Sequence, residues 1–167
     1  MSLTSACLAA GPRRPTLRPT PVLQPELFFA GHTHGEGTVA VRGRAPQPLR
    51  VDGHGTVESD GTFRLDQTLT IGDAPAETRT WRLRRTGATT YMATLSDARG
   101  QVTAESEGNR FHLRYLIRHP AVVMEQWLYL EPDGRTVRNI ATISVLGLPW
   151  VRLAEGITRD TPLSALP

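Results

Sequence analysis

Residues 62–71 read TFRLDQTLTI, and residues 79–84 read RTWRLR. In the first run, phenylalanine, leucine and isoleucine alternate with polar residues, and Gln67 falls on the apolar side. Because successive side chains of a strand point to opposite faces, this pattern predicts a strand with one buried face and one solvated face. The second run repeats the pattern, except that Arg79 shares the apolar side with Trp81. A guanidinium on the inner face of a β structure must be paired or hydrated, since an unpaired buried charge is very costly.

The size and composition of the chain indicate one soluble domain. The 167 residues are 39% hydrophobic and 21% charged, which is enough for a substantial core. No apolar run approaches the roughly 20 residues of a membrane-spanning helix, so we predict no membrane span. All 19 basic residues are arginines, and they are scattered along the chain without a nucleic-acid-binding motif. We therefore predict no nucleic-acid partner, despite the net charge of +3.

The prolines divide the chain into three parts. Residues 1–25 contain five prolines and no periodicity, which predicts an extended arm or a disordered leader. A β-barrel domain is expected over residues 26–160, followed by a short tail at residues 161–167. The single cysteine, Cys7, excludes an intramolecular disulfide, and its surroundings loosely resemble the end of a bacterial lipoprotein signal without the usual hydrophobic core.

Alternating segments continue along the rest of the chain, separated by short turns rich in glycine, proline and aspartate. Helical spacing is weak, so nine or ten short strands in an antiparallel up-and-down meander are expected. Closing such a sheet into a barrel removes its exposed edges, and a barrel of this size can hold one small ligand. The fold class is therefore predicted to be all-β. The expected strands are 38–42, 49–58, 62–71, 78–85, 89–96, 101–107, 111–117, 125–130, 136–145 and 151–158.

A series of short motifs occurs in a characteristic order. These motifs are Phe28-Phe29-x-Gly31, Arg79-x-Trp81, Tyr91, Asp97-x-x-Gly100, Gly108-Asn109, Tyr115, Trp127-x-Tyr129 and Arg138-Asn139. From Leu27 to Arg159 this order resembles the bacterial lipocalin-like family catalogued as domain of unknown function 3833. The resemblance implies a calycin-type β-barrel and, for many members, a signal-peptide or lipoprotein start, but no established activity. The chain has Gly72-Asp73 where the family usually has Asp-Gly, which leaves the geometry of that turn open.

The resemblance leaves the location of the protein open between the bacterial cytoplasm and the cell envelope. A periplasmic location is expected if a signal or lipoprotein start was removed.

His32, His34 and Glu36 alternate, so an extended chain directs all three to one side. Two imidazoles and a carboxylate could bind a divalent metal ion. The glycines between them suggest a flexible loop, however, and metal ligands need a supported geometry. We therefore predict a solvated polar segment, no metal site and no cofactor.

Strand parity places a second polar group on the inner face of the barrel. Arg79 could pair with Asp97 and fasten strands together, or it could meet the head group of an amphipathic ligand. Asn139 joins this group if Val137 points inward, whereas the parity of the strand around Trp127 is ambiguous. The predicted ligand-binding residues are Arg79, Trp81, Tyr91, Asp97, Tyr115, Trp127 and Asn139.

Three functional hypotheses remain. The leading one is a lipocalin-like protein that binds a small apolar or amphipathic molecule inside the barrel. The second is a barrel enzyme of isomerase or hydratase type, in which Arg79, Asp97 and a tyrosine act on a hydrophobic substrate. The third is a structural domain of the cell envelope without a ligand. The sequence has no nucleophile elbow, metalloprotease motif, phosphate loop or dinucleotide fingerprint, so no catalytic residue is assigned and an enzyme is less expected than a binding protein.

Overall fold

The structure is a computed structural model that describes residues 11–117 and 121–160. Cys7 and the tail expected at residues 161–167 lie outside the described residues.

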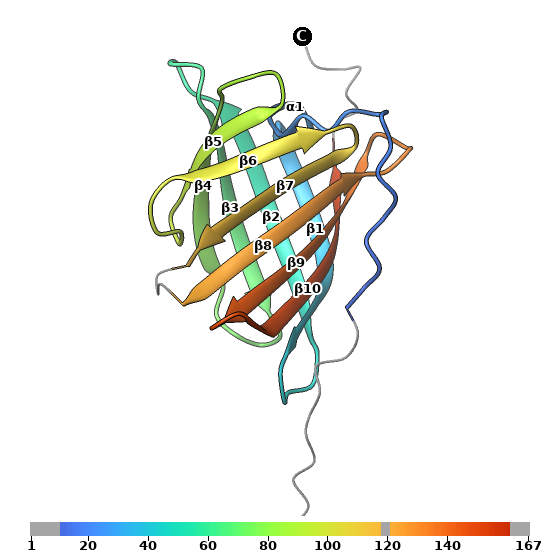
Figure 1. The fold of residues 1–167 in the computed structure, drawn as a ribbon, viewed down its shortest axis with the longest axis vertical. Helices are drawn as coiled ribbons and strands as arrows, with labels where there is room; N and C mark the ends of the chain where they lie inside the picture. The colour runs from blue at the N-terminus through green and yellow to red at the C-terminus, as the bar shows by residue number, and fades with distance from the viewer. Residues whose placement is uncertain (1–10, 118–120, 161–167) are drawn as a thin grey trace, which may run out of the picture.

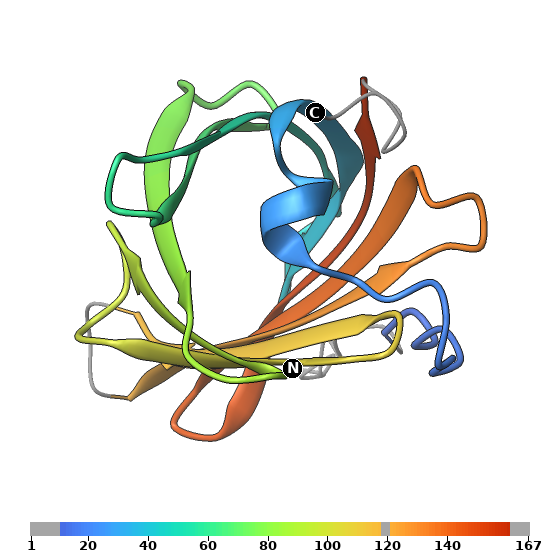
Figure 2. The same ribbon diagram turned by 90° about the horizontal axis from the view of Figure 1, so that it is seen from above.

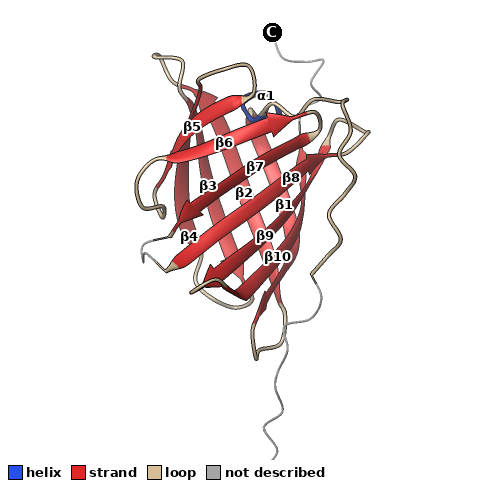
Figure 3. Cartoon of the chain, viewed as in Figure 1, coloured by secondary structure: helices blue, strands red, loops and turns tan. Residues whose placement is uncertain are grey.

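The fold is a closed antiparallel barrel of ten strands, each paired with its neighbours in sequence, with β1 also paired to β10 (Figures 1 and 3). This confirms the predicted up-and-down meander and its closure. A helix of one turn, α1 (Pro25–Phe28), precedes the barrel. The strands are β1 (Gly31–Val41), β2 (Gln47–Val57), β3 (Phe63–Ile71), β4 (Glu77–Arg85), β5 (Thr90–Leu95), β6 (Val102–Glu107), β7 (Arg110–Leu116), β8 (Val122–Leu130), β9 (Thr136–Val145) and β10 (Leu148–Arg159).

The β3–β4 pair has the alternation that the sequence predicts. Leu65 lies opposite Trp81, and Gln67 lies opposite Arg79. On the inner face, an apolar residue therefore meets an apolar residue and a polar residue meets a polar one. Phe63, Leu65 and Trp81 are buried in the main core. The turn after β3 places Gly72 at a φ of 56°, a conformation that glycine adopts without steric cost, so Gly72-Asp73 suits the turn.

Strand β1 is longer than expected, because it begins at Gly31 instead of residue 38. The segment with His32, His34 and Glu36 is therefore a strand and not a flexible loop, which corrects the sequence-based interpretation. Its glycines leave room for neighbouring groups. A Cβ atom at Gly35 would overlap the carboxyl group of Glu155.

The glycines of β2 also mark close approaches, as expected for glycine within a strand. A Cβ atom at Gly53 would come within 2.5 Å of Thr33 Oγ1, and one at Gly55 would overlap the carbonyl oxygen of Phe29. The Gly55 contact lets the chain leading into β1 approach β2 closely.

Helix α1 lies across part of one open end of the barrel (Figure 2). Phe28 and Phe29 on and beside this helix belong to the main core, together with Leu23 from the preceding arm. Asn109 ties the arm to the barrel, because its side-chain oxygen accepts a hydrogen bond of 2.7 Å from the backbone N–H of Arg18. Residues 11–24 therefore lie against the barrel and contribute to its packing.

A second, smaller core cluster of Val39, Leu49 and Val51 lies toward the other end of the barrel.

No helix among the described residues is long and apolar enough to cross a membrane.

Candidate functional site: the barrel interior

The interior of the barrel contains a cavity of about 40 Å³, measured as the space open to the centre of a water molecule. A volume of this size holds a small number of water molecules. Most of its wall is apolar, and its five polar residues lie one each on β3, β4, β8, β9 and β10. The polar lining residues are Gln67, Arg79, Gln126, Asn139 and Glu155.

Asn139 and Glu155 form a buried polar pair on the adjacent strands β9 and β10. Asn139 is 5% exposed and Glu155 is 7% exposed. Asn139 Nδ2 donates a hydrogen bond of 3.0 Å to Glu155 Oε2. Asn139 Oδ1 and Glu155 Oε1 are also buried, and neither has a hydrogen-bond partner among the described residues. Buried acceptors of this kind are uncommon in folded proteins, and they are candidates for contact with a ligand.

The environment of Glu155 favours its neutral form. Burial raises the pKa of this carboxyl group, whereas the hydrogen bond from Asn139 and the charge of Arg79 lower it by less. The net direction is upward because transfer of a carboxylate from water to the barrel interior carries a large desolvation cost. The cavity wall therefore presents a carboxyl group that retains its proton to a higher pH than an exposed glutamate does.

Arg79 also lines the cavity, but its guanidinium is partly engaged. Arg79 Nε donates a hydrogen bond of 3.2 Å to Gln67 Oε1, and the indole Nε1 of Trp81 donates one of 2.9 Å to the same oxygen. Arg79 Nη1 lies 4.0 Å from Asp97 Oδ2, at the limit of an ion pair. The sequence left open whether Arg79 pairs with an acid or faces a cavity, and the structure shows both.

Tyr115 lies near this group without bonding to it. Its ring meets the ring of Trp81 edge to face, with centroids 6.1 Å apart. Burial and the nearby carboxylate of Asp97 raise the pKa of the Tyr115 hydroxyl, which has no hydrogen-bond partner among the described residues. Asp97 and Tyr115 stand beside Arg79 but do not line the cavity itself.

Tyr91 is separate from the Arg79 group, because it lies near α1. Its hydroxyl donates a hydrogen bond of 3.3 Å to Glu26 Oε1, and the guanidinium of Arg85 lies 4.9 Å from its ring centroid. Burial and the adjacent Glu26 raise the pKa of the Tyr91 hydroxyl. Tyr91 therefore connects the helix to the barrel and does not reach the cavity.

Trp127 lies on the outer face of the barrel. Its neighbours Gln126 and Leu128 line the cavity, so strand alternation directs Trp127 outward. The indole stacks on His112 at a centroid distance of 3.6 Å, and Arg14 of the N-terminal arm lies 4.1 Å from the ring centroid on a cation–π contact. Of the residues proposed from the sequence, Arg79, Trp81 and Asn139 line the cavity, and Trp127 is on the other side of the wall.

Sequence reasoning missed Gln126 and Glu155 as cavity residues. The sequence did indicate Glu155. It is two positions from Leu153 and from Ile157, so it shares their apolar face of the last strand, as Arg79 shares a face with Trp81. Gln126 had no clear signal, since the strand around it is apolar on both faces.

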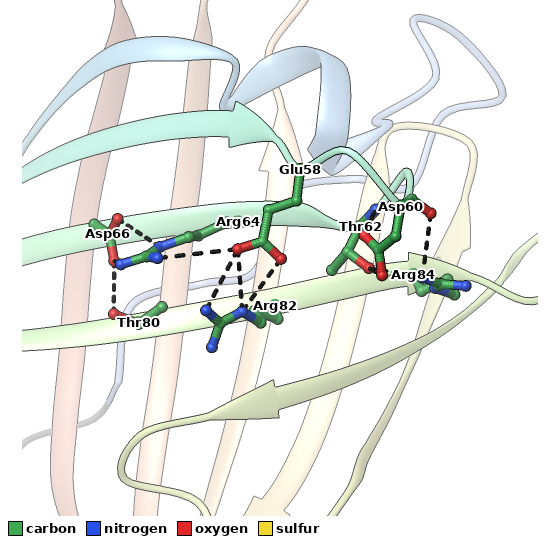
Figure 4. Close-up of polar contacts among 8 residues, drawn as sticks. All are labelled: Glu58, Asp60, Thr62, Arg64, Asp66, Thr80, Arg82 and Arg84. Atoms are coloured by element: carbon green, nitrogen blue, oxygen red, sulfur yellow. Dashed lines mark hydrogen bonds and ion pairs between the residues drawn. The ribbon is translucent and has the colours of Figure 1, made fainter.

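The outer face of β3 and β4 has a different electrostatic character, because its charges are matched in pairs (Figure 4). Asp66 accepts hydrogen bonds from Arg64, at 2.8 and 3.1 Å, and from Thr80 Oγ1, at 2.6 Å. Three arginines face three acids on this surface, so it is not a free basic patch. The ion pairs are Arg64–Asp66, Arg82–Glu58 and Arg84–Asp60.

His32, His34 and Glu36 are exposed on the outer face of β1. His34 Nδ1 lies 2.7 Å from Asp52 Oδ1, a hydrogen bond that raises the pKa of the imidazole, with a further contribution from the charge of Asp160. Within residues 11–117 and 121–160, no three His, Cys, Asp or Glu side chains are grouped so as to hold a metal ion.

Comparison with solved structures supports the barrel assignment. The S-type phycobiliprotein lyase CPES from Guillardia theta superposes with a TM-score of 0.65 at 8% sequence identity, over 82% of this chain and 91% of that chain. A protein of unknown function from the DUF3598 family of Nostoc punctiforme superposes with a TM-score of 0.59 at 16% identity, over 82% of this chain and 49% of that chain. At these identities the likeness concerns the fold alone.

A search of curated proteins finds no match to this sequence. The model of one protein family, described as protein of unknown function (DUF3833), matches residues 1–156. The match covers nearly the whole chain and agrees with the resemblance seen in the short motifs. This chain therefore belongs to the DUF3833 family.

Proposed function

We propose that the barrel binds a small amphipathic molecule, with its apolar part among the core side chains and its polar end against Asn139 and Glu155. The observation that supports this most directly is the pair of buried oxygens, Asn139 Oδ1 and Glu155 Oε1, that have no partner among the described residues. Leaving a buried acceptor unpaired costs about 1–3 kcal/mol, and a ligand that donates to it recovers part of that free energy. The surrounding wall is apolar, as is usual in small-molecule sites.

The polar end of the ligand is expected to be neutral and to carry a hydrogen-bond donor. Arg79 is the cation of the cavity, but Gln67 and Asp97 already contact it. A ligand carboxylate would therefore gain little from Arg79, its transfer from water into the barrel carries a large desolvation cost, and it has no proton to donate to Asn139 Oδ1. A hydroxyl group suits the site better, because it can donate to Asn139 Oδ1 and also accept from a protonated Glu155.

A ligand much larger than a few water molecules requires the barrel to open. The cavity of about 40 Å³ is far smaller than the roughly 300–1,000 Å³ of typical ligand pockets. We infer that the wall opens at α1, which has only four residues and no side-chain hydrogen bond at its N-cap. Opening would have to expose Phe28 and break the contacts of Glu26 with Arg85 and Tyr91. Pro25 and Phe29 on and beside α1 line the cavity, so displacement of this helix would enlarge it.

The enzyme hypothesis lacks an equivalent observation. It requires Arg79, Asp97 and a tyrosine within hydrogen-bond reach of one another. Arg79 Nη1 and Asp97 Oδ2 are 4.0 Å apart, which is beyond hydrogen-bond distance. The Tyr115 hydroxyl has no hydrogen-bond partner among the described residues. A binding function is therefore the proposal that the geometry supports best.

The test compares three probes that share one alkyl chain: decanol, decylamine and decanoate. Binding is measured by calorimetry near neutral pH, and native mass spectrometry of the protein purified from its own host looks for a co-purified molecule. Decanol should bind about tenfold or more tightly than decanoate, corresponding to about one hydrogen bond. Asn139→Leu should weaken decanol binding about tenfold, whereas Arg138→Gln, an exposed change on the same strand, should leave it unchanged.

Equal affinity for the three probes would contradict the proposed polar end of the ligand. The absence of binding to any of them, together with an empty protein in native mass spectrometry, would contradict the binding function.

A further inference from the structure

The β9–β10 hairpin turns at the end of the barrel opposite α1 (Figure 1). The side chains at this turn are apolar and exposed. Leu146 is 81% exposed, Leu148 is 60% exposed and Trp150 is 46% exposed. Isolated apolar residues on a surface are common, but three within five positions of one projecting tip form a patch. This patch is called the hairpin tip here, and it comprises Leu146, Leu148 and Trp150.

The backbone conformation of the turn is unfavourable for leucine, so Leu146 does not stabilise the hairpin. Val145 pairs with Leu148, so the turn has two residues, Leu146 at a φ of 50° and Gly147 at a φ of 80°. Two-residue turns with positive φ at both positions favour Asn-Gly or Asp-Gly, because asparagine and aspartate tolerate this conformation better than other non-glycine residues. A leucine here is strained and exposed, and it contributes nothing to the core. Its presence therefore points to a contact outside the chain.

Two arginines of the β1–β2 turn lie beside the hairpin tip. The backbone N–H of Arg42 donates a hydrogen bond of 2.9 Å to the carbonyl oxygen of Trp150, and the Arg42 guanidinium lies 5.9 Å from the Trp150 ring centroid. Arg44 is in the same β1–β2 turn, and neither arginine belongs to an ion pair within residues 11–117 and 121–160. Asp73 of the β3–β4 turn and the exposed Glu77 at the start of β4 are at this end too, so the basic character is local to the β1–β2 turn.

We propose that the hairpin tip docks onto an anionic lipid surface, with Leu146 and Leu148 inserted and with Arg42 and Arg44 at the level of the headgroups. Tryptophan is enriched at membrane interfaces, and each arginine near an anionic surface strengthens attachment. A protein partner is less suited to this feature, because a stable protein interface buries about 800 Å² on each side, whereas the tip is narrow and projecting. Insertion into a lipid surface needs apolar area and charge but no matching shape.

The test uses the whole protein and two kinds of vesicle, phosphatidylcholine alone and equal parts of phosphatidylcholine and phosphatidylglycerol. Co-sedimentation measures binding, and tryptophan fluorescence reports the location of the tip. Trp81 is buried and Trp127 is covered by His112 and Arg14, so a blue shift on vesicle addition should come from Trp150. Quenching by brominated lipids, absent in Trp150→Phe, checks that assignment.

Three variants separate the contributions. Leu146→Asn combined with Leu148→Thr retains Trp150 as a reporter and creates a favoured turn, so it should fold at least as stably as the natural chain and bind the anionic vesicles about tenfold or more weakly. Arg42→Ser combined with Arg44→Ser should remove the preference for anionic vesicles. Val57→Thr changes a residue that is 67% exposed at the α1 end, and it should leave binding unchanged.

Failure of the natural protein to bind the anionic vesicles would overturn the proposal. Equal binding by the Leu146→Asn/Leu148→Thr variant would overturn it as well. Self-association of the natural protein that this variant abolishes, without vesicle binding, would assign the hairpin tip to a second copy of the chain instead.

Discussion

Replacement of Glu155 by glutamine should remove a pH dependence of stability that originates inside the barrel. The change keeps the size of the side chain and the oxygen that accepts the hydrogen bond from Asn139 Nδ2. It replaces the other carboxyl oxygen with an NH2 group and removes the ability to ionise. Comparison of the two proteins therefore isolates the titration of one buried carboxyl group.

The sign and slope follow from the raised pKa of Glu155, whose ordinary value is 4.5 and whose main perturbation is burial. Below that value the carboxyl group is protonated in both the folded and unfolded states, and the pH has no effect through it. At higher pH the unfolded chain releases the proton while the folded chain retains it, so rising pH favours unfolding. The free energy of unfolding of the natural protein should fall relative to Glu155→Gln by about 1.4 kcal/mol per pH unit, until the folded-state pKa is passed.

Urea unfolding over a series of pH values, followed by far-UV circular dichroism of the barrel strands, measures this difference. We define the difference as the free energy of unfolding of the natural protein minus that of Glu155→Gln. This difference should decline from about pH 4.5 and then level off, and the pH at which it levels off gives the folded-state pKa of Glu155. Titrations of all other groups cancel in the difference when the two folds are the same. A constant difference across the pH range would refute burial as the dominant influence, and a difference that increases with pH would mean that Arg79 stabilises Glu155 as a carboxylate.

Two further changes test the packing around the cavity. Gln67→Leu removes the oxygen that accepts hydrogen bonds from Trp81 Nε1 and Arg79 Nε, and it should lower the free energy of unfolding by about 1–3 kcal/mol in urea titrations; an unchanged midpoint would show that these two hydrogen bonds have no net effect. Gly55→Ala should destabilise the barrel by about 1–3 kcal/mol, because the new methyl group overlaps the carbonyl oxygen of Phe29. Its matched control is Gly156→Ala, where no atom lies within 4 Å of the new methyl group and a small gain in stability is expected; equal effects at the two glycines would contradict the close approach seen at Gly55.

The sequence by itself determined the architecture, because strand alternation is a local property. Residues two positions apart in a strand lie on the same face whatever surrounds them. Phe63, Leu65 and Trp81 could therefore be assigned to the interior from the amino-acid sequence. The same rule singled out Arg79 as an unusual inner residue. Turn residues then separated one strand from the next, and the short connections favoured an up-and-down meander, whose closure into a barrel the structure confirms.

The face of Trp127 could not be determined in this way. Leu128, Tyr129 and Leu130 are all buried, so the end of β8 is covered on both sides, and the apolar residues at 127–130 show no alternation in the sequence. The outer cover is the N-terminal arm, whose Arg14 lies over the Trp127 ring and whose Arg18 donates a hydrogen bond of 3.1 Å to the carbonyl oxygen of Leu130. Contacts between segments more than one hundred residues apart in sequence decide this orientation.

The partners of the inner polar residues were also decided only by the tertiary structure. Parity placed Arg79, Asp97 and Asn139 on the inner face, but it gave no positions around the barrel. Closure and strand register set Asn139 beside Glu155, and set Arg79 between Gln67 and Asp97. The sequence determined which side chains point inward because that depends on the chain's own repeat, whereas the tertiary structure decided which of them meet because that depends on how distant strands are aligned.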